Sequence, residues 1–215
     1  MAFLVFEGLD GAGKSTLING IRSHLQSLGQ QVYLTREPGG TPLGEEIRGQ
    51  LLRAEGDTPL PRTEVLLYEA SRAQHVDRVI RPALEQGKWI LCDRFAPSTV
   101  AFQVGGRGLD RKVIDDLNNY ATDGLRPDLV ILIDLSVEES LKRMSHREQE
   151  RGQKKDRFER EAQQFHEGVR ASYLEQAKEA PDVWLVLDGL LSPDKLLKLL
   201  LSQLEKKGWL DFLTK

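Results

Sequence analysis

The stretch Phe3-Leu4-Val5-Phe6-Glu7-Gly8-Leu9-Asp10-Gly11-Ala12-Gly13-Lys14-Ser15-Thr16 decides the fold. An apolar run typical of a buried strand leads into the pattern Gly-x-x-x-x-Gly-Lys-Ser, and a helical pattern follows. In such a loop the glycines let main-chain N–H groups approach an anion, and the helix adds the positive end of its dipole. We therefore expect the whole segment 8–16 to bind the phosphates of a nucleoside triphosphate.

Two side chains of this loop carry specific chemistry. The Lys14 ammonium can reach the outer phosphates, and the Ser15 hydroxyl can ligate Mg²⁺. Asp93 directly follows the apolar run Ile90-Leu91-Cys92, and ligands gather at the carboxyl ends of parallel strands. We therefore predict Asp93 as the acid that helps to hold Mg²⁺ or its waters. The acids that end two other apolar runs, Asp134 and Asp188, are interpreted as caps of the next turn or as neighbours of the nucleotide base.

Composition sets outer bounds on the kind of protein. The chain has 215 residues, a net charge of −3 and a single cysteine, Cys92. This length favours one α/β domain, and the charge makes non-specific nucleic-acid binding unexpected. Since no disulfide can form within the chain, a reducing, cytoplasmic compartment is expected. The N-terminus lacks the features of a signal peptide, and no apolar run is long enough to suggest a membrane span.

Apolar runs alternate with helical patterns along the chain. The predicted strands are Phe3–Phe6, Gln31–Thr35, Trp89–Cys92, Leu129–Ile133 and Val183–Leu187. They lack polar alternation, as parallel strands covered on both faces do. Helices are predicted from Lys14 to Leu28 and over Thr63–Leu84, Arg111–Ala121, Val137–Arg151, Glu161–Lys178 and Pro193–Lys207, and a break near His75 is left open. This order predicts a three-layer α/β sandwich of the P-loop nucleoside triphosphate hydrolase type, with a five-stranded parallel sheet.

A phosphate loop alone identifies only nucleoside triphosphate binding, but four further motifs narrow the choice among the protein families that contain such a loop. They are Arg36-Glu37-Pro38-Gly39-Gly40-Thr41, Tyr68-Glu69-Ala70-Ser71-Arg72-Ala73-Gln74-His75, Asp93-Arg94-Phe95 continuing to Ala101-Phe102-Gln103, and Asp156-Arg157-Phe158-Glu159. In this order the motifs closely resemble the thymidylate kinase family, from Phe3 to about Lys178. The resemblance implies Mg²⁺-dependent transfer of the γ-phosphate of ATP to dTMP by a homodimer. A kinase of another nucleoside monophosphate, or a binding module without catalysis, remains an alternative.

Three arginines are candidates for binding the 5′-phosphate of the acceptor. Arg36, Arg48 and Arg94 carry guanidinium groups, which match phosphate geometry with two parallel hydrogen bonds. The alternative for each is a surface ion pair, which contributes little to stability.

The resemblance also assigns residues around the thymidine. It implies that Tyr68 stacks on the thymine ring, that Arg72 faces O4 and that Gln103 faces the N3 edge. Asp10 would accept the 3′-hydroxyl or orient the phosphoryl acceptor, and Pro38, Ser98 and Thr99 would lie near the same pocket. The alternatives are a core aromatic for Tyr68, a turn-forming acid for Asp10, and a simple turn at 97–99.

The resemblance also implies one more arginine that stabilises charge during the transfer. Some thymidylate kinases carry it within the phosphate loop and others in a mobile lid, and here Ala12 occupies the loop position. The segment from Arg143 to Arg160 contains seven basic and four acidic residues, so we predict a mobile helical lid there. Its leading candidates are Arg147, Arg151 and Arg157, which join Lys14, Arg94 and Asp10 as the predicted catalytic set. The alternative is a solvated helix face with ion pairs between successive turns.

Overall fold

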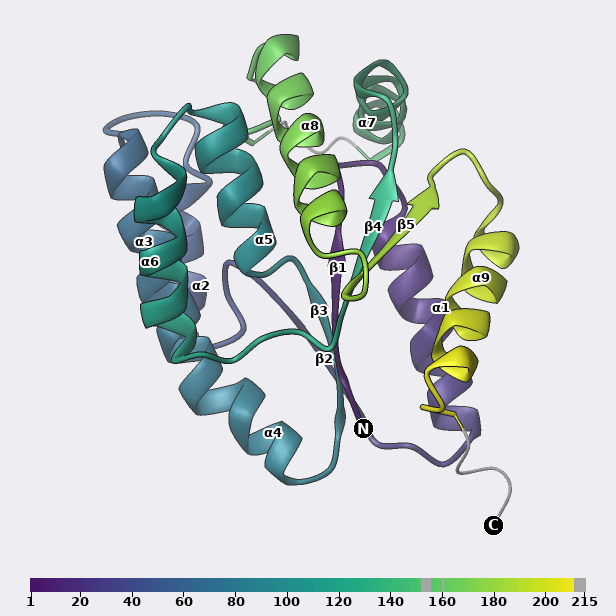
Figure 1. Ribbon diagram of the computed structural model, residues 1–215. Coiled ribbons are helices and arrows are strands. Elements are labelled where there is room, and N and C mark those ends of the chain that lie inside the picture. The colour runs from purple at the N-terminus through teal and green to yellow at the C-terminus, as the bar shows by residue number, and fades with distance from the viewer. Residues whose placement is uncertain (152–155, 160, 211–215) are drawn as a thin grey trace.

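Five parallel strands form one sheet in the order β2-β3-β1-β4-β5 (Figure 1). The structure is a computed structural model that describes residues 1–151, 156–159 and 161–210, leaving aside the side chains of 147–151. The strands are β1 (Phe3–Glu7), β2 (Val32–Arg36), β3 (Trp89–Asp93), β4 (Leu129–Asp134) and β5 (Trp184–Asp188). The predicted five-stranded parallel sheet is therefore confirmed.

Each strand ends one residue later than the apolar pattern predicts. The last strand residues are Glu7, Arg36, Asp93, Asp134 and Asp188. Backbone pairing continues past the last buried apolar side chain, because the ladder depends on main-chain groups rather than on side-chain polarity. As a result, polar side chains from all five strands stand at one edge of the sheet.

Helices cover both faces of the sheet (Figure 1). On one face lie α1 (Lys14–Ser27) and α9 (Pro193–Lys206). The remaining helices are α2 (Pro42–Leu51), α3 (Pro61–His75), α4 (Arg81–Glu85), α5 (Ala96–Thr99), α6 (Arg111–Thr122), α7 (Val137–Arg151) and α8 (Gln163–Glu179), with the π-helical turns η1 (Val76–Ile80) and η2 (Val100–Gly106). Within the described residues, no helix is both long enough and apolar enough to cross a membrane.

The central strand β1 shows why the sequence there is apolar without alternation. Leu4 and Phe6 belong to the core beneath α1 and α9, whereas Phe3 and Val5 belong to the core on the opposite face. All four are 1% exposed or less. Burial on both faces removes the polar positions that a half-exposed strand would show.

The predicted helix over Thr63–Leu84 extends from Pro61 to Glu85 as α3, η1 and α4. At the place near His75 where the sequence leaves a break open, the structure has a π-helical turn over Val76–Ile80, in which the chain stays helical. A π-helical turn accommodates one extra residue relative to the α-helical hydrogen-bond pattern. It therefore shifts the apolar periodicity without ending the helix.

Two helical segments were missed from the sequence. The helix α2 begins with Thr41 as its N-cap, whose side chain accepts a hydrogen bond from the Gly44 N–H at 2.9 Å. The segment formed by α5 and η2 contains a proline in its first turn and ends in Gly105 and Gly106, which hid its helical character. Both segments lead from the ends of strands into the region described below.

The turn η2 and the helix α8 pass each other at backbone contact. A Cβ atom on Gly105 would lie 2.4 Å from the Gly168 carbonyl oxygen, and one on Gly168 would lie 2.2 Å from the Gly105 oxygen. No side chain larger than hydrogen fits at either position. This close crossing brings Tyr173 of α8 to the ends of β1 and β3, where its hydroxyl contacts Glu7 at 2.8 Å.

Candidate functional site

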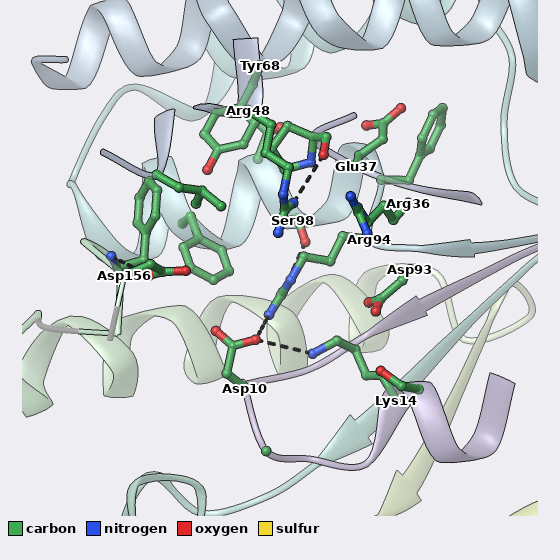
Figure 2. Close-up of a pocket in the computed structure, with 18 of the residues that line it drawn as sticks. Asp10, Lys14, Arg36, Glu37, Arg48, Tyr68, Asp93, Arg94, Ser98 and Asp156 are labelled. Carbon is green, nitrogen blue, oxygen red and sulfur yellow. Dashed lines mark hydrogen bonds and ion pairs between the residues drawn. The ribbon is translucent and has the colours of Figure 1, made fainter. Parts of the chain in front are cut away.

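A cavity of about 480 Å³ opens at the carboxyl edge of the sheet (Figure 2). The structure brings most of the predicted site residues to it, from segments far apart in the sequence. Those that line the cavity are Asp10, Gly11, Gly13, Lys14, Ser15, Thr16, Arg36, Pro38, Arg48, Tyr68, Arg72, Asp93, Arg94, Ser98 and Thr99.

The phosphate loop has the backbone conformation that its glycines allow. Gly8 has a φ of 134°, and a Cβ atom there would lie 2.5 Å from the Ile133 carbonyl oxygen. Gly13 has a φ of 102° and directly precedes α1, whose first N–H groups have no acceptor within the helix. Gly8, Leu9 and Ala12 belong to the loop without lining the cavity. The loop therefore presents a helix N-terminus to the cavity, as an anion site requires.

Lys14 lies folded over this loop. Its Nζ donates to the carbonyl oxygens of Gly8 and Leu9, each at 3.1 Å, and the residue is 7% exposed. Burial and the nearby Arg94 lower the pKa of Lys14, while Asp10 and Asp93 act in the opposite direction. The ammonium is thus held at the cavity by two carbonyl groups and lies 3.7 Å from the Asp10 carboxylate, and it keeps hydrogens that can bind an anion.

Arg94 holds a strained position at the start of the loop after β3. Its φ is 69°, a value that residues with a side chain rarely adopt. Its Nη2 donates to Asp10 at 2.8 Å, and its Nη1 donates to Tyr173 at 3.0 Å and to Ser98 at 3.3 Å. Figure 2 shows the Arg94 guanidinium reaching toward Asp10, on which Lys14 also converges. Strained residues persist where the surroundings fix them, commonly at functional sites.

Two further guanidinium groups line the same cavity. Arg36, at the end of β2, donates to Glu45 at 3.0 Å and remains 54% exposed. Arg48 of α2 is partly buried and donates to the Pro38 carbonyl at 3.1 Å. The cavity lining has more basic than acidic side chains, although the chain is acidic overall: Lys14, Arg36, Arg48, Arg72, Arg94 and Arg143 against Asp10, Glu37, Asp93 and Asp156. Such a lining suits phosphate groups.

Asp93 fits a role in binding a divalent cation. Its Oδ1 is buried and, among the described residues, has no hydrogen-bond partner. Asp93 and Ser15 both line the cavity. Among the described residues there is no group of three or more His, Cys, Asp or Glu that could hold a metal ion alone. Mg²⁺ suits this arrangement, because it takes few protein ligands and completes its shell with phosphates and waters.

Aromatic rings form the far end of the cavity. Phe158 packs against Tyr68 with ring centroids 6.3 Å apart and against Phe102 at 5.9 Å, nearly perpendicular. Burial, reinforced by Glu64, raises the pKa of Tyr68, so its hydroxyl stays neutral. Of these three aromatic residues, only Tyr68 was assigned a role from the sequence. Phe102 and Phe158 belong to the quoted motifs, and this membership was the sequence feature that could have indicated them.

Arg72 is fixed by a buried network behind the rings. It is 1% exposed, its Nε donates to Glu37 at 2.8 Å, and its Nη1 contacts Glu69 at 2.8 Å and Asn118 at 2.7 Å. Thr99, at 2.9 Å, is a further acceptor for Nη1. Burial alone would lower the pKa of Arg72, but the two carboxylates outweigh it and raise that pKa. Glu37 lines the cavity too and had no assigned role, although it follows Arg36 directly.

Two further predicted site residues, Gln103 and Arg157, do not line the cavity either, and both donate to Glu64. The Gln103 Nε2 donates to Glu64 at 2.9 Å, while its Oε1 is buried with no partner among the described residues. Arg157 donates to Glu64 at 2.6 Å and to the Pro59 carbonyl at 2.7 Å. The side chains of Arg147 and Arg151 lie outside the described residues.

The segments on both sides of 147–155 contact the cavity. Arg143 of α7 lines it and donates to the carbonyl oxygens of Gly11 at 3.5 Å and Gly189 at 3.1 Å. Asp156 lines it from the other end of the segment. The sequence placed both residues in the predicted lid without giving either a role. Their side chains now connect that segment to the phosphate loop and to the cavity.

Comparison with known proteins gives consistent matches. The chain matches a family model described as thymidylate kinase over residues 6–199. A thymidylate kinase of Bdellovibrio bacteriovorus is 54% identical over 207 residues, covering 96% of this chain and 97% of that protein. A thymidylate kinase of Trichlorobacter lovleyi is 46% identical over 192 residues, covering 89% and 91%. A thymidylate kinase of Desulfovibrio desulfuricans is 45% identical over 194 residues, covering 89% of each chain.

Proposed function

The chain belongs to the thymidylate kinase family and is a dTMP kinase, which converts dTMP and ATP into dTDP and ADP. We propose that this phosphoryl transfer takes place in the cavity around Arg94. One observation carries the assignment of the site. The phosphate loop and the guanidinium groups of Arg36, Arg48 and Arg94 line the same cavity. A donor phosphate and an acceptor phosphate can therefore meet there.

We infer a donor side and an acceptor side within the cavity. Residues 8–16 would bind the phosphates of ATP, and the three arginines would bind the 5′-phosphate of dTMP. Asp10 lies between the two, 2.8 Å from Arg94 and 3.7 Å from Lys14. A phosphate oxygen is already a nucleophile, so the site has to supply position and positive charge rather than a base. Asp10 would then orient the acceptor, directly or through the 3′-hydroxyl of its sugar.

Ser15 and Asp93 are the proposed protein ligands of Mg²⁺. The orphaned carboxylate oxygen of Asp93 supports this role, as does the loop serine at the N-terminus of α1. The ion would neutralise charge on the ATP phosphates. The neighbouring Lys14 adds a fixed positive charge from the protein itself.

The aromatic end of the cavity would bind the thymine. Tyr68, Phe102 and Arg72 line the cavity, where the two rings would supply stacking faces and the guanidinium would face the base. The orientation of the Gln103 amide supports the predicted contact with N3 of thymine. Because Glu64 accepts from its Nε2, the amide is oriented with Oε1 left to accept, and that atom has no partner among the described residues. Thymine offers an N–H donor at N3, which matches this free acceptor.

Replacing Lys14 with alanine should lower kcat by at least about 10²-fold, because one preorganised charge donor is lost. The measurement is ADP release in a coupled assay with ATP, Mg²⁺ and dTMP. Lys112→Ala is the matched control, since Lys112 is exposed on α6 and its ion pair within the described residues is with the exposed Asp116. Near-normal turnover of Lys14→Ala, with an unchanged thermal unfolding temperature, would remove Lys14 from the chemistry.

The enzyme should use dUMP as a poor but real substrate. The two bases share their hydrogen-bonding edge and differ by one methyl group, and one methyl in an apolar pocket discriminates only about 10- to 200-fold. The same coupled assay gives kcat/KM for dUMP and dTMP side by side. Equal efficiency with both would show that no pocket surrounds the methyl group.

We further propose a homodimer that works in the cytoplasm. The neighbouring helices α3 and α6 carry exposed apolar side chains, since Leu66 is 59% exposed, Val113 54% and Tyr120 86%. Exposed apolar surface of this kind suits contact with a second copy of the chain. The only cysteine, Cys92, is buried and free, which suits a reducing compartment.

A further inference from the structure

Glu7 is a fully buried carboxylate to which the proposed function gives no role. It ends β1 directly before the phosphate loop and is 0% exposed. Its Oε1 accepts from the Phe95 N–H at 2.9 Å, and its Oε2 accepts from Ser98 at 2.6 Å and Tyr173 at 2.8 Å. Burial raises the pKa of Glu7, while Arg94 and these hydrogen bonds oppose the rise. A buried acid is costly, so its retention calls for an explanation.

The two hydroxyl groups that contact Glu7 also contact Arg94. Arg94 Nη1 lies 3.3 Å from the Ser98 oxygen and 3.0 Å from the Tyr173 oxygen, and these two oxygens are 2.8 Å apart. Each hydroxyl has a single hydrogen to donate. A carboxylate oxygen is a stronger acceptor than a hydroxyl oxygen, and Oε2 lies only 3.9 Å from the cationic Arg94 Nη1. Both hydroxyl hydrogens therefore point to Glu7, and both oxygens keep lone pairs for Arg94.

This arrangement uses every hydrogen of Arg94 Nη1. One goes to Ser98 and one to Tyr173, while Nη2 already donates to Asp10. The guanidinium is thus fixed on the Nη1 side, and its Nε hydrogen and the second hydrogen of Nη2, which have no hydrogen bond among the described residues, are left for a phosphate. We propose that Glu7 and Tyr173 are positioning residues, which orient Arg94 toward the acceptor phosphate through the direction of two hydroxyl hydrogen bonds. This inference rests on the proposed function of Arg94.

A purely structural role is the competing explanation, and a double-mutant cycle separates the two. Tyr173→Phe removes only the hydroxyl, and the ring keeps its packing beside Phe165 and Val169. If the hydroxyl acts through Arg94, Tyr173→Phe should lower kcat/KM for dTMP about 10-fold in the wild-type background. In an Arg94→Ala background the same change should alter kcat/KM by less than about twofold. The control is Tyr33→Phe, on a tyrosine of β2 that does not line the cavity.

Glu7→Gln tests the direction of the hydrogen bonds. To keep its bond to the Phe95 N–H, the glutamine must turn its NH₂ group toward the two hydroxyls. Those hydroxyls would then accept from Gln and lose the acceptor that keeps their hydrogens turned away from Arg94 Nη1. We expect about a 10²-fold loss of kcat/KM, larger than for Tyr173→Phe. This loss should likewise vanish in the Arg94→Ala background.

The outcomes distinguish this inference from the proposed function. Equal losses from Tyr173→Phe in both backgrounds, with Arg94→Ala itself impaired, would overturn the positioning role and leave the function of Arg94 intact. Full activity of Arg94→Ala would instead contradict the proposed function, and the inference with it. Should Glu7→Gln fail to fold by thermal unfolding, the Tyr173 cycle decides the question alone.

Discussion

Replacing Arg147, Arg151 and Arg157 together with alanine should lower kcat by about 10³- to 10⁵-fold, while the KM for dTMP changes little. An arginine that meets charge developing during phosphoryl transfer stabilises the transition state and not the ground state. Since Ala12 occupies the loop position, the predicted lid has to supply that arginine. Steady-state ADP release at varied dTMP gives kcat and KM separately.

The backbone of α7 supports the choice of residues. In the sequence, Arg147 and Arg151 follow Arg143 at intervals of four residues, the spacing at which helical positions share a face. Arg143 itself lines the cavity and contacts the phosphate loop through the Gly11 carbonyl. On the far side of the segment, Asp156 lines the cavity as well. A lid bounded by these two residues would close over the site of transfer.

Two comparisons sharpen this test. The single change Arg157→Ala should act mainly through stability, because Arg157 is held by Glu64 and the Pro59 carbonyl in the structure. The double change of Arg147 and Arg151 should retain most of the loss in kcat. Lys142→Ala, at an exposed position on α7, is the neutral control. A higher KM with unchanged kcat in the triple variant would make the segment a binding surface only.

The enzyme should reject dCMP by up to about 10⁴-fold in kcat/KM relative to dTMP. Cytosine reverses the pattern of thymine at two positions, because its N3 is an acceptor and its C4 carries an amino donor. The Gln103 Oε1 would then face another acceptor, since Glu64 already holds the Nε2. Likewise Arg72, which can only donate, would face the amino group. Both mismatches leave buried polar groups unpaired.

This discrimination can be traced to its residues. Gln103→Leu should lower kcat/KM for dTMP and reduce the dTMP-to-dCMP ratio by at least about tenfold, because one of the two mismatches disappears. The assay compares both nucleotides at equal enzyme concentration. Comparable turnover of dTMP and dCMP by the unmodified enzyme would favour a kinase of another nucleoside monophosphate.

Local patterns in the sequence predicted the sheet and the loop well. The apolar runs located all five strands, and the glycine spacing located the turn at residues 8–16, because both depend on neighbouring residues. Motif resemblance then identified the arginines Arg36, Arg48 and Arg94, which the structure brings to one cavity. Strand ends were misplaced by one residue, since apolar pattern and backbone pairing do not stop together.

What the sequence did not reveal depends on distant contacts. Glu7 and Tyr173 are 166 positions apart, and nothing in their local surroundings indicates that they meet. Their proximity follows from the crossing of α8 with η2 at Gly105 and Gly168. Gln103 illustrates the same limit: the motif indicated a base-reading residue, but its hydrogen bond to Glu64 and its position outside the cavity lining depend on contacts that the local sequence does not reveal.

A crystal structure with dTMP, Mg²⁺ and a non-hydrolysable ATP analogue tests the central claim most directly. We expect the 5′-phosphate of dTMP on the guanidinium of Arg94, the thymine beside Tyr68 and Phe102, and the donor phosphates on the amides of residues 8–16. A nucleotide bound elsewhere, with the loop and Arg94 free of phosphate, would contradict the account.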